Sequence, residues 1–277
     1  MSGRSVLKGC SRAHQHPFEL PMRERPGFPA KLNLVPPARA QTRAAAPIYG
    51  GASPAALRPQ GLGLDSSAVR HNMVSKLAGQ GVQDAMVLSA MGAVERHRFV
   101  DTALVNQAYE DTSLPIGLGQ TISKPGVVAR MLELLRNAST GKLGRVLEIG
   151  TGCGYQAAVI SHLASEVYSI ERLKGLHEKA RENLRPMRLA NVHLLLGDGM
   201  LGYPQGGPYA AIISAAGGEA VPSAWIEQLA VGGRLVAPVA SGARGQQALV
   251  VIDKTAQGVR QSVLEAVHFV PLKSGIA

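Results

Sequence analysis

The sequence predicts an α/β fold in which a mostly parallel, doubly wound sheet has helices on both faces, with N-terminal helices before it and an antiparallel C-terminal hairpin. Short apolar stretches alternate with helical patterns from Gly144 to Ala240, as in a parallel sheet with crossover helices. The stretches are apolar on both faces, so helices must cover both sides of the sheet. The last two stretches, 247–255 and 262–272, have no helix between them, which indicates the hairpin.

The elements follow in chain order. The apolar pattern predicts two helices, at residues 66–81 and 83–96. Residues 114–125 (LPIGLGQTISKP) predict a flexible loop, and 125–138 predict a strongly amphipathic helix. Strands are then expected at 144–150, 166–171, 192–199, 209–216 and 232–240, and helices at 155–164, 173–187 and 222–230.

Residues 1–65 predict a disordered Pro/Arg-rich extension, with the folded domain at 66–277. The extension contains nine prolines and no periodic apolar pattern, so it cannot bury enough surface to offset the entropy of ordering it. Its nine Lys/Arg against three Asp/Glu account for +6 of the net charge of +10. The alternatives are a transit peptide and a true start near Met73.

Composition restricts the partners and the compartment. The rest of the chain carries only +4 and few aromatic residues, which argues against nucleic acid. No apolar run reaches the roughly 20 residues that span a bilayer, so we expect no membrane partner. Cys10 and Cys153 lie far apart, and no Cys/His cluster has metal-ligand spacing. We therefore expect no metal and a reducing, cytoplasmic location.

The first predicted strand ends in a glycine-rich turn. Gly150, Gly152 and Gly154 have the spacing G-x-G-x-G, which permits a tight turn and a close ligand. The alternative is a turn that merely needs glycine. Glu148, just before them, is expected to point into the crevice beyond the strands, where ligands bind in open parallel sheets. A carboxylate there would repel a pyrophosphate and favour a cationic amino-acid group.

The next strands also end in residues that suit a nucleoside. Glu171 ends the second strand, where an acid accepts hydrogen bonds from both ribose hydroxyls, although an exposed helix-capping acid is the alternative. Asp198 lies between two glycines and suits either an adenine amino group or a turn. The fourth strand ends in the small residues 214–218, which leave room for a reacting group. A ribose-binding acid without a pyrophosphate loop favours S-adenosylmethionine (AdoMet) over NAD.

Five segments of the chain resemble protein-L-isoaspartate O-methyltransferases of the bacterial type. They are LPIGLGQTIS (114–123), VLEIGTGCGYQAAVI (146–160), IERLKGL (170–176), GDG (197–199) and VHFVPL (267–272). The resemblance extends from about Met73 to Lys273, and QTIS is its most specific part. It implies a Rossmann-like class I AdoMet-dependent methyltransferase. The implied reaction methylates the free α-carboxylate of L-isoaspartyl residues in damaged proteins and peptides, and repair follows through a succinimide.

The resemblance also implies roles by position, with Ser123 as the active-site serine. Cofactor contacts fall on Gln120, Thr121, Ile122, Glu148, Gly150, Thr151, Gly152, Gly154, Glu171, Asp198 and Gly199. Substrate contacts fall on Leu114, Pro115, Ser214, Ala215, Ala216 and Val221. The chain departs from the family pattern at Cys153, Ala210 and the segment 214–218, where a looser substrate wall is expected to affect turnover more than cofactor binding.

The implied chemistry needs positioning rather than a base. A free carboxyl titrates at roughly 3.5–4, so it is already ionised at pH 7. Ser123 is expected to donate a hydrogen bond to this carboxylate, and the positive end of the following helix favours the same anion. The alternative is that Ser123 caps this helix, with Pro125 in the first turn.

Three other functions stay open beside a monomeric repair enzyme. An AdoMet-dependent methyltransferase acting on a small molecule or RNA is disfavoured by the QTIS motif and the balanced charge. A non-catalytic AdoMet- or isoaspartate-binding adaptor has only the altered segment 214–218 in its support. An NAD-dependent oxidoreductase is disfavoured by the glycine spacing.

Overall fold

The computed structural model describes residues 67–137, 139–242 and 246–277. The extension predicted at 1–65 therefore lies outside the described residues, as does Cys10. No helix within the described ranges is long and apolar enough to cross a membrane.

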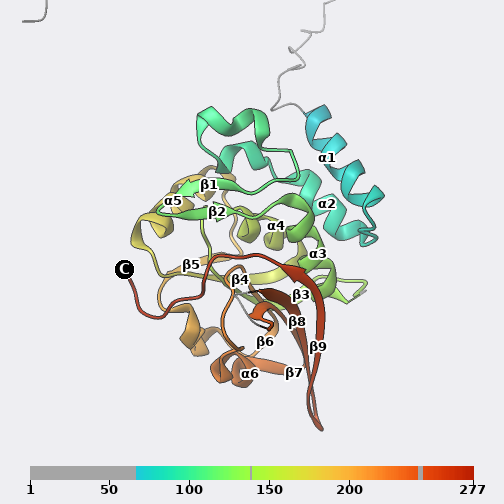
Figure 1. Cartoon of the computed structure of the whole chain (residues 1–277), viewed down its shortest axis with the longest axis vertical. Helices are drawn as coiled ribbons and strands as arrows, with labels where there is room; N and C mark the ends of the chain where they lie inside the picture. The colour runs from blue at the N-terminus through green and yellow to red at the C-terminus, as the bar shows by residue number, and fades with distance from the viewer. Residues whose placement is uncertain (1–66, 138, 243–245) are drawn as a thin grey trace, which may run out of the picture. The chain divides into compact units, whose positions relative to one another are not determined.

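A sheet of seven strands forms the centre of the described part, in the order β5-β4-β3-β6-β7-β8-β9 (Figure 1). Its strands are β3 (Leu143–Ile149), β4 (Ala164–Glu171), β5 (Val192–Leu196), β6 (Tyr209–Ser214), β7 (Leu229–Ala240), β8 (Gln247–Thr255) and β9 (Gly258–Val267). Strands β3 to β7 run parallel, while β8 and β9 form the antiparallel end. The predicted fold class is confirmed. The chain order reverses between β3 and β6, which places a ligand crevice at their carboxyl ends.

Helices cover both faces of this sheet. One face packs against α3 (Pro125–Arg136), α4 (Tyr155–Leu163) and α5 (Lys174–Leu184), and the other packs against α6 (Ser223–Gln228). Two N-terminal helices, α1 (Ser67–Gly79) and α2 (Ala85–Ala93), pack on the outside of α3 and α4. Side chains alternate along the strands as the pleat requires. Val146 belongs to the core under the first five helices, whereas the next residue, Leu147, belongs to the core around Trp225 of α6.

Short 3-10 helices connect these elements, and the sequence did not predict them. They are η1 (Arg96–Phe99), η2 (Thr102–Gln107), η3 (Arg185–Met187), η4 (Gly199–Leu201) and η5 (Pro204–Gly206).

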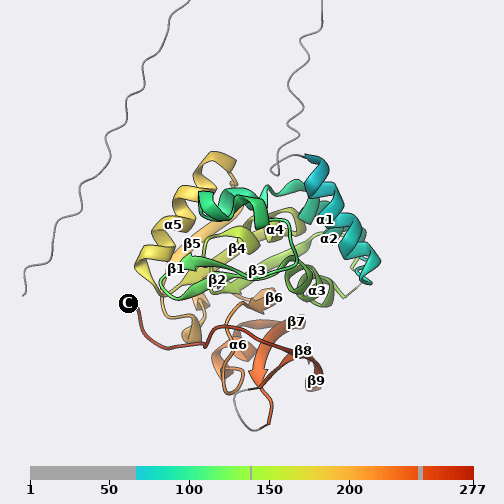
Figure 2. The same ribbon diagram turned by 45° about the horizontal axis from the view of Figure 1, so that its top comes forward.

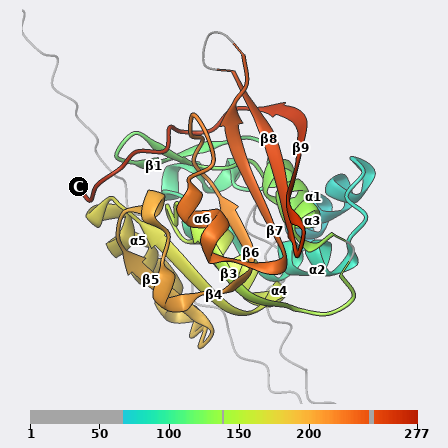
Figure 3. The ribbon, with the colours of Figure 1, turned by 90° about the horizontal axis from the view of Figure 1, so that it is seen from below.

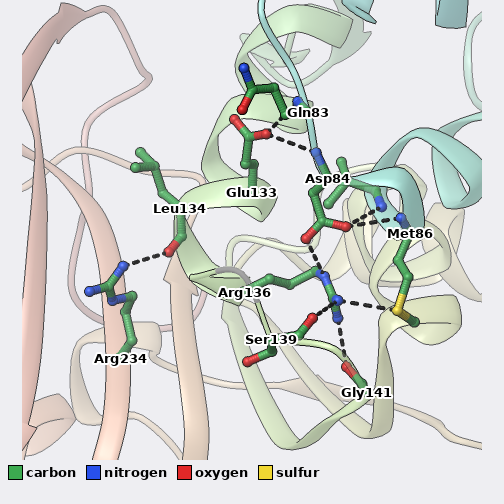
Figure 4. Close-up of polar contacts among 10 residues, drawn as sticks. Gln83, Asp84, Met86, Glu133, Leu134, Arg136, Ser139, Gly141 and Arg234 are labelled. Atoms are coloured by element: carbon green, nitrogen blue, oxygen red, sulfur yellow. Dashed lines mark hydrogen bonds and ion pairs between the residues drawn. The ribbon is translucent and has the colours of Figure 1, made fainter.

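An ion pair joins α2 to the end of α3 (Figure 4). The carboxylate of Asp84 caps α2 by accepting from the backbone N–H of Met86 and of Val87. Its other oxygen accepts from Nε of Arg136 at 2.7 Å, and the Arg136 side chain is 1% exposed. Glu133, one turn earlier on α3, accepts from the backbone N–H of Asp84 at 3.0 Å. These charged groups connect the N-terminal layer to α3 by hydrogen bonds stronger than neutral ones.

The segment predicted as a flexible loop is a hairpin, so that prediction is wrong. Strands β1 (Leu114–Gly117) and β2 (Gln120–Ile122) pair antiparallel. Leu118 and Gly119 turn between them with φ of 52° and 69°, the left-handed conformation that two-residue hairpin turns require. The hairpin lies between α5 and α3 (Figures 1 and 2), and Nζ of Lys179 on α5 donates 2.8 Å to the carbonyl of Ile116.

Candidate active site

A cavity of about 290 Å³ lies at the carboxyl ends of the central parallel strands. Five segments contribute to its wall: the β1–β2 hairpin, the glycine-rich turn after β3, the residues after β4, the end of β6 and the C-terminal segment after β9. Figure 3 shows the C-terminal segment running from β9 past the hairpin towards α5. The cavity therefore occupies the crevice that the reversal of strand order creates.

The glycine-rich turn presents backbone rather than side chains to this cavity. Gly150 and Gly152 have φ of 89° and 56° and lie on the wall. A Cβ on Gly152 would lie 3.2 Å from Cδ1 of Ile116 in the hairpin, so a side chain would begin to fill the gap between turn and hairpin. Gly154 is not on the wall. A Cβ there would meet Leu184 of α5 at 3.1 Å, so this glycine permits helix packing.

Glu171 connects the glycine-rich turn to the end of β4. Its Oε2 accepts from the backbone N–H of Gly152 and its Oε1 from that of Leu173, both at 2.9 Å. It is 6% exposed and lies on the cavity wall, which differs from the exposed helix cap considered as the alternative. Each carboxylate oxygen can accept a second hydrogen bond, so Glu171 keeps acceptor capacity for a pair of hydroxyls.

Glu148 lies beneath the site rather than in it, which corrects the expectation that it points into the crevice. Its side chain is fully buried, and its Oε2 accepts from the hydroxyl of Ser169. The Ser169 hydroxyl is in turn 2.6 Å from that of Thr151, which is on the cavity wall. Burial raises the pKa of Glu148 to about 8. The group is therefore mostly protonated near neutral pH. It is connected to the cavity wall through these two hydroxyls and is also affected by Gln156, which lines the same wall.

Asp198 adopts the turn that was one of its two predicted roles. Its Oδ1 accepts from the backbone N–H of Met200 at 2.9 Å, and its Oδ2 accepts from that of Gly275 at 2.7 Å. It caps a short helix and binds the C-terminal segment, and the neighbouring Gly199, not Asp198, is on the cavity wall. The direct adenine contact stays a prediction.

A second cavity, of about 460 Å³, adjoins the first and shares part of its wall. The residues common to both are Thr121, Ser123, Ala215 and Val270. Within the described ranges, the hydroxyl of Ser123 makes no hydrogen bond to another protein group, although the side chain is half-buried. Ser123 thus presents a free donor and acceptor where a molecule in one cavity would meet a molecule in the other.

The start of α3 explains why this hydroxyl is free. The N-cap residue is Lys124, which makes no side-chain cap. The backbone N–H of Gly126 donates instead to Oδ1 of Asp111 at 2.7 Å. The capping alternative for Ser123 is therefore wrong. The carboxylate of Asp111 lies at this helix end, and the expectation that the end also attracts the substrate anion stays a prediction.

The other predicted residues divide between the cavity wall and the core. Those on the wall of the first cavity are Gln120, Thr121, Ile122, Ser123, Gly150, Thr151, Gly152, Glu171, Gly199, Ala215 and Ala216. Leu114 is buried in the core, Pro115 is exposed on β1, and Val221 packs against the core around Trp225. Ser214 is buried and its hydroxyl donates 2.8 Å to the carbonyl of Ala216.

Sequence reasoning missed several residues of the wall. They are Ile116, Leu118, Val128, Ile149, Cys153, Tyr155, Gln156, Ile170, Arg172, Leu173, Leu176 and Val270–Lys273. Arg172 and Leu173 could have been found, because they follow Glu171 directly. The C-terminal segment could not, because it is placed by backbone pairing with Gly217, whose N–H donates to the carbonyl of Val270 at 2.8 Å.

Comparison with known proteins agrees with this architecture. The family model described as protein-L-isoaspartate(D-aspartate) O-methyltransferase matches residues 68–277. A protein-L-isoaspartate O-methyltransferase of Methylibium petroleiphilum is 55% identical over 262 residues, which cover 91% of this chain and 97% of that protein. One of Leptothrix cholodnii is 58% identical over 248 residues, covering 89% and 87%.

Two solved structures show the same fold. A protein-L-isoaspartate O-methyltransferase superposes with a TM-score of 0.67 at 28% identity, covering 74% of this chain and 66% of that one. A beta-aspartate methyltransferase from Plasmodium falciparum, in complex with S-adenosyl-L-homocysteine, gives 0.65 at 25% identity, covering 74% and 98%. The chain belongs to the protein-L-isoaspartate(D-aspartate) O-methyltransferase family.

Proposed function

We propose that this chain transfers the methyl group of AdoMet to the free α-carboxylate of L-isoaspartyl residues in damaged proteins and peptides. The observation that supports the proposal most directly is the unpaired hydroxyl of Ser123 in the wall common to two adjoining cavities. One cavity has a glycine-rich turn and a carboxylate at its wall, which fits a nucleoside. The other is open enough, at about 460 Å³, for part of a peptide.

The residues of the first cavity fit AdoMet by their chemistry. Glu171 offers acceptors for two ribose hydroxyls, and the bare backbone at Gly150 and Gly152 leaves space beside it. When bound, AdoMet supplies a methyl group on a positively charged sulfur. Ala215 and Ala216 leave room at the junction, where this methyl group would meet the second cavity.

In this mechanism the chain positions the substrate and performs no proton transfer. The attacking carboxylate is ionised at pH 7, so no base is required. Ser123 donates a hydrogen bond to one carboxylate oxygen, which orients the other towards the methyl group. The hairpin, β6 and the C-terminal segment exclude water from the junction. Orientation of this kind contributes up to roughly 7–11 kcal/mol in the best cases.

The remaining features of the proposal concern the setting of this activity. We infer that the protein acts as a monomer in the cytoplasm and needs neither nucleic acid nor a membrane. We also infer that residues 1–65 form an extension outside the catalytic domain. The match to the family model, which begins at residue 68, supports that boundary.

The test is methylation with methyl-labelled AdoMet of two matched peptides, one with an isoaspartyl residue and one with a normal aspartyl residue. We expect base-labile methyl esters on the isoaspartyl peptide alone. Label on neither peptide, with AdoMet still bound, would contradict the proposal and favour the binding adaptor. Label on a small molecule or RNA instead would favour the alternative methyltransferase.

A further inference from the structure

Asp111 lies at the base of the hairpin, close to the start of α3. It precedes β1 by a short connection, whereas Ser123 directly follows β2. Leu114 at the start of β1 pairs with Ile122 at the end of β2, so the hairpin brings the two positions together. Oδ1 of Asp111 accepts from the N–H of Gly126, and Oδ2 lies 3.9 Å from Nζ of Lys124.

The N–H that Asp111 binds is the one that Ser123 would otherwise take. A serine before a helix accepts from the N–H two or three residues ahead. Two residues ahead of Ser123 is Pro125, which has no N–H. Three residues ahead is Gly126, whose N–H already donates to Asp111. The hydroxyl of Ser123 therefore has no local hydrogen-bond partner, because the carboxylate of Asp111 accepts the hydrogen bond from the helix end in its place.

The absence of a side chain at Gly126 leaves the space that the Asp111 carboxylate occupies. A Cβ on Gly126 would lie 2.9 Å from Oδ1 and 3.1 Å from Oδ2 of Asp111. Any other residue would push the carboxylate away from the helix end. The buried guanidinium of Arg96 is close enough to interact with Asp111 electrostatically, which adds a positive charge to the surroundings of this carboxylate.

We propose that Asp111 is a positioning residue for the methyl transfer: by capping α3 in place of Ser123, it keeps the Ser123 hydroxyl available to the substrate carboxylate. This inference rests on the proposed function of Ser123. Without Asp111, the hydroxyl of Ser123 turns to accept from Gly126 and no longer serves the substrate. The helix keeps a cap in that state, so the loss appears in peptide turnover more than in folding.

The experiment compares the variants Asp111→Ala, Asp111→Asn, Ser123→Ala and the double variant Asp111→Ala/Ser123→Ala in the full chain. An isoaspartyl peptide is titrated for kcat and KM, and the Kd of AdoMet is measured by calorimetry. We expect Asp111→Ala to lower kcat/KM by about tenfold, which corresponds to the loss of one hydrogen bond to a charged group. The AdoMet Kd of this variant should stay within about twofold of the wild-type value. Asp111→Asn keeps an acceptor for Gly126 and should restore most of the activity.

The double variant decides whether Asp111 acts through Ser123. If it does, the double variant is no slower than Ser123→Ala, because effects on one group are not additive. The inference would be overturned if the losses of kcat/KM in the two single variants multiplied in the double variant. It would also be overturned if Asp111→Ala left kcat/KM unchanged, or if Asp111→Asn lost as much kcat/KM as Asp111→Ala. Wild-type protein that methylates no isoaspartyl peptide would instead defeat the proposed function, before any variant is compared.

Two further variants separate positioning from folding. Gly126→Ala displaces the same carboxylate without removing it, so it should reproduce the loss of kcat/KM even if Asp111→Ala folds poorly. Glu95→Ala removes a half-exposed acid that lines neither cavity and makes no contact with Asp111 or Ser123 in the described ranges. It should leave the peptide KM unchanged while the protein stays folded. A change in the peptide KM equal to that of Asp111→Ala would overturn the inference.

Discussion

The backbone N–H of Gly275 donates a hydrogen bond of 2.7 Å to Oδ2 of Asp198. This contact attaches the C-terminal segment to the turn after β5. Two more backbone bonds attach the same segment beside β4, from Lys174 N to the carbonyl of Ala277 and from Ala277 N to that of Arg172. Since residues 270–273 line the first cavity, these bonds hold one part of its wall in place.

Replacing Asp198 with alanine should therefore loosen the C-terminal segment and weaken AdoMet binding. We expect faster hydrogen exchange across residues 270–277 and a several-fold higher AdoMet Kd, because one hydrogen bond to a charged group is lost. Exchange is followed by mass spectrometry and binding by calorimetry. Asp253→Ala, which breaks the ion pair between Asp253 on β8 and Arg234 on β7, is the control and should change neither. Unaltered exchange at the C-terminal segment would contradict this account.

Glu171→Ala should reduce AdoMet affinity more strongly, by roughly 10- to 100-fold, because two partly buried N–H groups lose their acceptor together with the proposed ribose contact. Equilibrium binding of AdoMet measures the effect. Glu178→Ala is a matched control, since Glu178 is an exposed acid whose ion pair with Lys174 has a separation of 3.9 Å. Wild-type affinity in Glu171→Ala would show that the acid is dispensable.

Glu148 should make stability fall with rising pH. Its pKa is raised from 4.5 to about 8 by burial, so between these values the folded state keeps a proton that the unfolded state has lost. This group alone then reduces the free energy of unfolding by about 1.4 kcal/mol per pH unit within that window. Urea unfolding of wild type and Glu148→Gln at pH 5.5 and 7.5 measures the difference. Wild type should lose more stability than the variant over this interval, and parallel losses would refute the assignment.

Cys153 should be chemically inert in the native protein although it stands on the cavity wall. It is 2% exposed, and burial raises the pKa of its thiol to about 11. At pH 8 the thiolate population is then about two orders of magnitude below that of an ordinary cysteine, and thiolate is the reactive form. Iodoacetamide labelling of a Cys10→Ser variant, read by mass spectrometry, should reach Cys153 only after unfolding. Rapid native labelling would disprove this.

The ion pair between Asp84 and Arg136 should be a major contribution to stability. Asp84→Ala leaves the buried guanidinium without its carboxylate, which typically costs roughly 3–5 kcal/mol. Chemical unfolding monitored by circular dichroism measures the change. Glu95→Ala, which removes an acid exposed at 42% from its pairs with Arg70 and Arg98, should cost less than about 1 kcal/mol. Equal losses in the two variants would argue against a special role for the buried pair.

The parts of the site that could be predicted are those set by local sequence. The glycine-rich turn and Glu171 lie at strand ends, and strand ends follow from apolar periodicity alone. Glu148 and Asp198 were placed at the right strands, but the residues that their side chains contact were not predicted. The direction of each side chain depends on a distant partner, Ser169 for one and Gly275 for the other.

Two features were missed for different reasons. The hairpin at 114–122 was predicted as a loop because one proline and two glycines obscure a short alternation of buried and exposed residues. The role of Asp111 required knowing that the residues before β1 return to the start of α3. Residue pairs of this kind have no local periodicity by which to find them.

The wall common to the two cavities has a consequence for inhibition. Because Ser123 and Ala215 border both spaces, one molecule that links an adenosine to a carboxylate-bearing peptide would fill both without crossing a protein barrier. The second half of such a molecule would bind intramolecularly once the first is bound, so its affinity would exceed that of either half. Selectivity over other AdoMet enzymes would come from the peptide half of the molecule, because that half binds in the second cavity rather than in the one proposed for AdoMet.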